Sequence, residues 1–111
     1  MISRIWRGWT SPENAAAYQS LLEAEILPGI ERRRMAGYRG AHLLRRELEH
    51  EVEFVTILWF DSLEAVRDFA GEDYEAAVVP AGARALLSHF DDRSAHYAVQ
   101  LKPPSPPSLE S

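Results

Sequence analysis

The pattern of hydrophobic positions is clearest over residues 52–60, which we predict to form a strand at the centre of a sheet. Side chains alternate between the two faces of a strand, and here both faces are apolar. One face carries Val55, Ile57 and Trp59, and the other carries Phe54, Leu58 and Phe60, with Thr56 between them. A strand that is apolar on both faces is normally covered on both sides.

Three further segments have the composition of strands. Residues 2–9 and 38–46 contain branched and aromatic side chains, and residues 93–101 form the last apolar stretch before a proline-rich end. The polar residues 47–51 are typical of a hairpin turn between the second and third predicted strands. We therefore expect four strands in the chain.

Two main helices are predicted between these strands. The first begins at Ser11, a capping residue followed by proline, and should kink or end at the Pro-Gly pair of residues 28–29. The second begins near Ser62 and stops at Gly71. Shorter helical segments are expected at residues 72–79, ended by Pro80, and at residues 83–88.

The resulting order, β-α-β-β-α-β, predicts an α+β fold of the ferredoxin-like type with an antiparallel four-stranded sheet. Right-handed crossovers place both helices on one face of that sheet. The opposite face would then be an exposed apolar surface larger than a monomer usually presents. Because a second copy of the sheet would cover it, we expect a homodimer in the form of a dimeric α/β barrel.

Composition narrows the classes of function. The 111 residues fit one domain, which we place at residues 1–101, followed by a flexible Pro/Ser-rich tail at residues 102–111. A net charge of −5 argues against nucleic-acid binding, which calls for a basic face. Because the chain has no cysteine, disulfides and thiolate metal sites are excluded. No apolar run reaches the ~20 residues of a membrane helix, and we expect a cytoplasmic protein.

The side chains that could hold a ligand are aromatic or basic. Trp59, at the end of the third strand, could stack a flat substrate, although tryptophans at strand ends more often pack in a core or an interface. Arg4 and Trp6 share one face of the first strand and could hold a phenolate or carboxylate against an aromatic wall. The competing interpretation pairs Arg4 with a glutamate, since a buried arginine is costly without a partner.

Histidine is the natural base near neutral pH, with an ordinary pKa of ~6.5. His96 is the strongest candidate, and its neighbour Tyr97 faces the opposite way on the last strand. His42 is a weaker candidate in the middle of the second strand. The four histidines lack the close spacing of a metal site, and no phosphate-binding glycine motif is present, so we predict neither a metal nor another cofactor.

Five segments of the chain resemble the antibiotic biosynthesis monooxygenase (ABM) family of the dimeric α/β-barrel superfamily. They are residues 2–8 (ISRIWRG), 37–41 (GYRGA), 54–65 (FVTILWFDSLEA), 69–74 (FAGEDY) and 95–97 (AHY), and the likeness extends over roughly residues 1–100. The resemblance implies a pocket between the helices and the sheet of each subunit. In such relatives the pocket holds a flat, often phenolic substrate, and some members oxygenate it without metal or flavin.

The resemblance also includes relatives that degrade haem, but this chain departs from their pattern. Those relatives use a histidine ligand and a tryptophan in the second helical region, and residues 63–88 contain no histidine or tryptophan. Three functions therefore stay open: a cofactor-independent monooxygenase acting on a small aromatic or polyketide-like compound, a homodimer that binds a small apolar ligand without converting it, and a purely structural homodimer. In the first, His96 would remove a proton, Trp59 and Trp6 would stack the substrate, and Arg4 or Tyr97 would stabilise the oxyanion.

Overall fold

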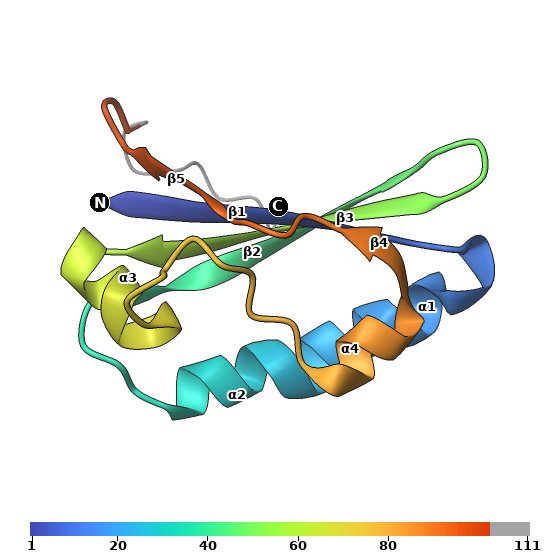
Figure 1. The fold of residues 1–111 in the computed structure, drawn as a ribbon, viewed down its shortest axis with the longest axis horizontal. Coiled ribbons are helices and arrows are strands. Elements are labelled where there is room, and N and C mark those ends of the chain that lie inside the picture. The colour runs from blue at the N-terminus through green and yellow to red at the C-terminus, as the bar shows by residue number, and fades with distance from the viewer. Residues whose placement is uncertain (103–111) are drawn as a thin grey trace, which may run out of the picture.

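The computed structural model describes residues 1–102, which fold into an antiparallel sheet with helices against one face (Figure 1). The strands are β1 (Ile2–Thr10), β2 (Tyr38–Glu47), β3 (Val52–Phe60), β4 (Leu87–Phe90) and β5 (Ala95–Ala98). They are ordered β2-β3-β1-β4, and β5 also pairs with β1. The α+β class is confirmed and the order is compatible with a ferredoxin-like fold, whereas the dimeric barrel stays a prediction.

The last strand predicted over residues 93–101 is confirmed as the shorter β5, whereas β4 was not predicted. β4 pairs with β1 around Gly8–Thr10, and β5 pairs with β1 around Ile2–Ile5. Between them, the Asp91 N–H still donates to the Arg7 carbonyl of β1 (2.9 Å), whereas residues 92–94 form backbone hydrogen bonds or a bridge with residues 75–77. The predicted four-stranded sheet is thus a five-stranded sheet in which two short strands share one position beside β1.

The first helical region is longer than its sequence pattern indicated. α1 (Pro12–Leu21) is capped by the Ser11 side chain, and it continues through a π-helical turn, η1 (Leu22–Ile26), into α2 (Leu27–Arg32). The predicted break at residues 28–29 is absent, because the wider π-helical turn comes before Pro28 and accommodates a residue that has no N–H to donate. No helix within residues 1–102 is both long and apolar enough to cross a bilayer.

The second helix, α3 (Leu63–Ala70), is confirmed with both of its end signals. The Ser62 side chain accepts a hydrogen bond from the Ala65 N–H (3.2 Å), and Gly71 ends the helix with a φ of 92°. The expected turn at residues 83–88 is instead α4 (Ala81–Leu86), followed directly by β4. Apart from Lys102, the predicted tail at residues 102–111 lies outside the described residues.

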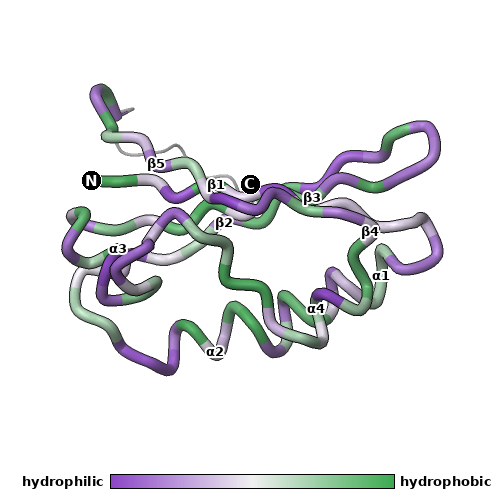
Figure 2. Tube along the Cα trace, viewed as in Figure 1, coloured by the Kyte–Doolittle hydropathy of each residue, from purple (hydrophilic) through white to green (hydrophobic). Residues whose placement is uncertain are grey.

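Residues 71–80, which we call the strap, connect α3 to α4 without forming the helix predicted at residues 72–79. Tertiary hydrogen bonds replace the helical ones: the Ala77 N–H donates to the Asp92 carbonyl (2.9 Å), and the Ser94 N–H donates to the Glu75 carbonyl (2.7 Å). The part of the strap that leads into α4 is hydrophobic (Figure 2). The strap therefore packs as an extended cover over the helical side of the sheet.

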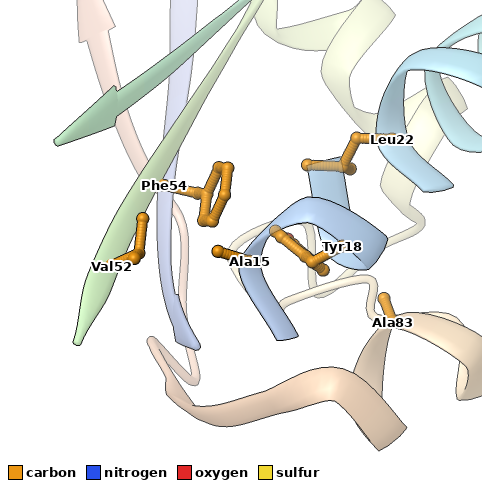
Figure 3. Close-up of a cluster of buried hydrophobic side chains, with 6 residues drawn as sticks. All are labelled: Ala15, Tyr18, Leu22, Val52, Phe54 and Ala83. Atoms are coloured by element: carbon orange, nitrogen blue, oxygen red, sulfur yellow. The ribbon is translucent and has the colours of Figure 1, made fainter. Parts of the chain in front are cut away.

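The alternation predicted for β3 decides where the core lies. Phe54 and Phe60 are fully buried beneath the helices, and Leu58 shares their face. Figure 3 shows the larger cluster, in which Phe54 points from the sheet toward Tyr18 of α1. The two rings meet edge to face with centroids 4.9 Å apart, so this cluster fixes α1 against β3.

The other face of the sheet is not covered by any element within residues 1–102 (Figure 1). The register aligns Ile5, Ile57 and His42 across β1, β3 and β2 on this outer face. Leu44 and Tyr97 on the same face are 48% and 58% exposed. The outer face is therefore apolar at its centre and open to solvent in the single chain.

Candidate functional site

A cavity of about 70 Å3 lies between the inner face of the sheet and the helices. Its walls are mostly apolar side chains from four regions of the chain, including Leu22, Ile26 and Ile30 of the first helical region, Leu58 of β3, Phe69 of α3 and Val79 of the strap. The polar side chains Arg4, Tyr18, Thr56 and Ser94 also line it. The expected pocket between helices and sheet is therefore present, although it is small.

Arg4 is the one side chain of this wall with a full charge. It is only 4% exposed. Its Nη1 donates to the Tyr74 carbonyl and to Nε2 of His96 (3.0 Å), and its Nη2 donates to the Ala76 carbonyl (3.1 Å). The Arg4 guanidinium thus joins β1 to the strap and to β5.

The charge of Arg4 is not neutralised within the described chain. No carboxylate of residues 1–102 forms an ion pair with it, so the predicted glutamate partner is not found within this part of the single chain, and a glutamate from a second copy stays a prediction. Burial lowers the pKa of Arg4 from 12.5 to about 10, which still leaves the guanidinium charged at neutral pH. A buried cation of this kind favours an anion beside it.

His96 lies behind Arg4 and does not line the cavity. Because a guanidinium can only donate, Nε2 of His96 is the acceptor and the ring hydrogen is on Nδ1. That Nδ1 is buried and has no hydrogen-bond partner among the described residues. Burial and then the charge of Arg4 lower the pKa of His96. The ring is therefore held neutral, with its basic nitrogen occupied by Arg4.

Trp6 lines the cavity with its ring, as the shared face with Arg4 predicted. Its indole N–H donates a hydrogen bond to the Asp91 carbonyl (2.7 Å), and the centroid of its ring lies 5.8 Å from that of the Phe90 ring. Phe69 supplies a second aromatic wall, with the Arg4 guanidinium carbon 5.5 Å from the ring centroid. Trp6 can therefore pack against a ligand but has no free donor to offer it.

The other three predicted site residues lie on the outer face, away from the cavity. Trp59 donates its indole N–H to Nδ1 of His42 (2.8 Å). Tyr97 pairs in register with Ser3 of β1 and points to the same outer face. The structure therefore does not bring Trp59, His42 or Tyr97 together with Arg4, Trp6 and His96. The even and odd positions of neighbouring strands separate these two groups.

Three polar residues of the cavity, Tyr18, Thr56 and Ser94, were missed from the sequence. Tyr18 follows the apolar stripe of the first helix and gave no sign of a polar role, but its hydroxyl makes no hydrogen bond to any described residue. Thr56 did carry a signal, as a hydroxyl among the apolar residues of the inner face of β3. Burial raises the pKa of Tyr18 to about 12, so its hydroxyl stays neutral.

No group of three or more histidine, cysteine, aspartate or glutamate side chains within residues 1–102 is arranged to hold a metal ion. Comparison with known proteins adds no name to the site. No protein-family model matches this chain, and no curated protein matches it. Membership of the ABM family therefore stays a prediction from the residues. A function has to be inferred from the geometry around Arg4.

Proposed function

We propose that this protein binds a small aromatic or polyketide-like compound with an anionic oxygen group in the cavity, and oxygenates it without a metal or flavin. The observation that supports binding is the buried side chain of Arg4, which lines the cavity and has no carboxylate partner among residues 1–102. Hydrogen bonds to a charged group stabilise by about 1.5–3 kcal/mol each. An anion in the cavity would satisfy the charge that the fold leaves uncompensated.

The same contact supports the chemistry. A phenolate or enolate reduces oxygen far more readily than its neutral acid does, and a nearby guanidinium favours that anion. A substrate CH2 group that becomes a carbonyl loses two C–H bonds and supplies four electrons. These electrons reduce O2 to the new carbonyl oxygen and one water, so no external reductant is needed.

His96 would act as the base in this scheme, at Nε2. That atom now accepts a hydrogen bond from Arg4 (3.0 Å), so proton transfer requires Arg4 to turn from His96 toward the substrate anion. Tyr97 has no part in the scheme because it lies on the outer face. In this proposal Arg4 replaces Tyr97 as the group that stabilises the oxyanion.

The size of the cavity means that the strap has to move. Pockets that enclose drug-sized ligands measure ~300–1,000 Å3, whereas this one measures about 70 Å3. The strap supplies Val78, Val79 and Pro80 to the wall, and it is tied to Arg4 through the carbonyls of Tyr74 and Ala76. Displacement of the strap would enlarge the cavity and free Arg4 in one step.

A carrier that binds such a compound without converting it is the second candidate. It is favoured by the position of His96, which does not line the cavity and whose Nε2 is engaged. Either function fits a homodimer in which the outer face meets a second copy. The apolar side chains Ile5, Val55 and Ile57 at its centre support that assembly, because burying them would remove apolar area from water.

Oxygen uptake with anthrone, a tricyclic ketone with a reactive CH2 group, separates these candidates. The assay contains EDTA and catalase and is run with the wild type, Arg4→Met and His96→Gln, with binding measured in parallel by calorimetry. The monooxygenase proposal expects anthraquinone formation above the protein-free rate, lost in Arg4→Met and reduced in His96→Gln. Binding without turnover would identify a carrier, and neither binding nor turnover would reject this cavity as the site.

A further inference from the structure

The hydrogen-bond donors of Arg4 are only partly used. A guanidinium has five N–H donors. The bonds to Tyr74, His96 and Ala76 account for both hydrogens of Nη1 and one of Nη2. The Nε hydrogen and the second Nη2 hydrogen have no partner within residues 1–102. Two donors on a nearly fully buried side chain that lines the cavity are therefore free for a ligand.

Nε and Nη2 form the edge of a guanidinium that binds a carboxylate through two parallel hydrogen bonds. Four other arginines of the described chain use that edge on a carboxylate: three bind both oxygens, and Arg46 binds Oε1 of Glu53 alone (2.9 and 2.8 Å). Arg7 holds Asp91 through Nε (2.9 Å) and Nη2 (3.3 Å). The same pairs of atoms join Arg39 to Asp61 (2.8 and 2.6 Å) and Arg45 to Glu47 (3.2 and 2.6 Å). At Arg4 the equivalent carboxylate is missing from the described chain.

We infer that the ligand of the cavity is an apolar carboxylic acid, whose carboxylate binds side-on to Nε and Nη2 of Arg4. This inference rests on the binding part of the proposed function, which the oxygenase and the carrier share, and it narrows the anionic group that Arg4 holds to a carboxylate. A carboxylate has two oxygens, one for each of the two donors on this edge of Arg4, whereas a phenolate has a single oxygen for both donors. The rest of the ligand is apolar, because leucine, isoleucine, valine and phenylalanine side chains make up most of the wall.

The hydroxyls of the cavity fit this assignment. Those of Tyr18 and Thr56 line the space, make no hydrogen bond to the described residues and carry no charge that could neutralise an anion. They can donate to the carboxylate or to a second polar atom of the ligand, while the full charge stays with Arg4. Arg4 is therefore the residue that would decide between an acid and its neutral analogue.

Calorimetry with matched compounds tests the inference. The series consists of benzoate, benzamide and phenol, together with 1-naphthoate, 1-naphthamide and 1-naphthol. For the wild type we expect each carboxylate to bind at least tenfold more tightly than the amide and the phenol of the same ring. Arg4→Lys keeps the charge but loses the two-donor edge, and should weaken carboxylate binding at least tenfold while changing phenol binding less than threefold. Arg39→Lys, which removes a two-donor edge outside the cavity, should change neither.

The outcomes separate the two proposals. If the wild type binds 1-naphthol or the amide as tightly as the carboxylate, the carboxylate assignment is overturned and a site for small aromatic compounds survives. If Arg4→Lys remains folded by circular dichroism and keeps its affinity for carboxylates, the two-donor edge is not used and the assignment is also overturned. If the wild type binds no compound of either ring size, the cavity is not a ligand site and both proposals fail.

Discussion

Replacing His96 with glutamine tests whether the buried ring is held neutral beside Arg4. In the folded protein, burial and the Arg4 charge lower the pKa of His96, with Glu75 acting in the opposite direction. In the unfolded chain the same histidine takes up a proton near pH 6.5. The unfolded state therefore binds more protons below that pH, and the free energy of unfolding must fall as the pH decreases. One full proton corresponds to a slope of ~1.4 kcal/mol per pH unit, which is the upper limit for this group.

Urea denaturation at pH 7.5, 6.5 and 5.5 measures this effect in the wild type, His96→Gln and His50→Gln. Glutamine at position 96 can still accept a hydrogen bond from Arg4 but cannot be protonated. The wild type and His96→Gln share every other residue, so any contribution from the rest of the chain cancels in their comparison. Between pH 6.5 and 5.5 the wild type should lose up to ~1.4 kcal/mol more than His96→Gln. His50, whose side chain is 86% exposed, should leave the wild-type slope unchanged. Parallel pH curves for the wild type and His96→Gln would refute the neutral, buried ring.

Three further predictions concern the fold and its assembly. Gly37→Ala should lower the free energy of unfolding, measured in urea, by at least ~2 kcal/mol, because φ is +85° and the new Cβ would lie 2.7 Å from Cβ of Ala65. Gly40→Ala, whose new Cβ would have no atom within 4 Å, should lower it less. Equal losses in the two variants would contradict this reasoning. Phe54→Ala should cost about 3–5 kcal/mol in the same assay, since the ring is fully buried; a loss below ~1 kcal/mol would contradict the core assignment. Ile57→Arg on the outer face should give a folded monomer in sedimentation velocity while the wild type sediments as a dimer, and a wild-type monomer would refute the homodimer.

Local signals in the sequence determined the elements whose ends depend on nearby residues. β3 was predicted with its observed bounds, Val52–Phe60, and with the correct division of its two faces. The helix starts at Ser11 and Ser62 were also predicted, because a capping hydroxyl acts within one turn of its own position. For the strand and the two helix starts, the information lies within a few residues, so a single sequence contains it. The pocket between helices and sheet was predicted only from the family resemblance.

Tertiary contacts decided everything that depends on residues far apart in the chain. The strap is not helical because residues 91–94 and Arg4 take its backbone hydrogen bonds, and these partners are about 15 to 70 positions away. Pairing with the far end of β1 also makes residues 87–90 a strand, β4, where the sequence predicted a helical turn. Strand register placed Trp59 on the outer face and Arg4 on the inner one, so tryptophans that the sequence grouped together are on opposite sides of the sheet. The sequence could show that Arg4 was costly to bury without a partner, but only the folded structure shows that no carboxylate within residues 1–102 forms an ion pair with it. Whether two charged side chains form an ion pair depends on the distance between them, and this distance is set only when the sheet and the strap pack together.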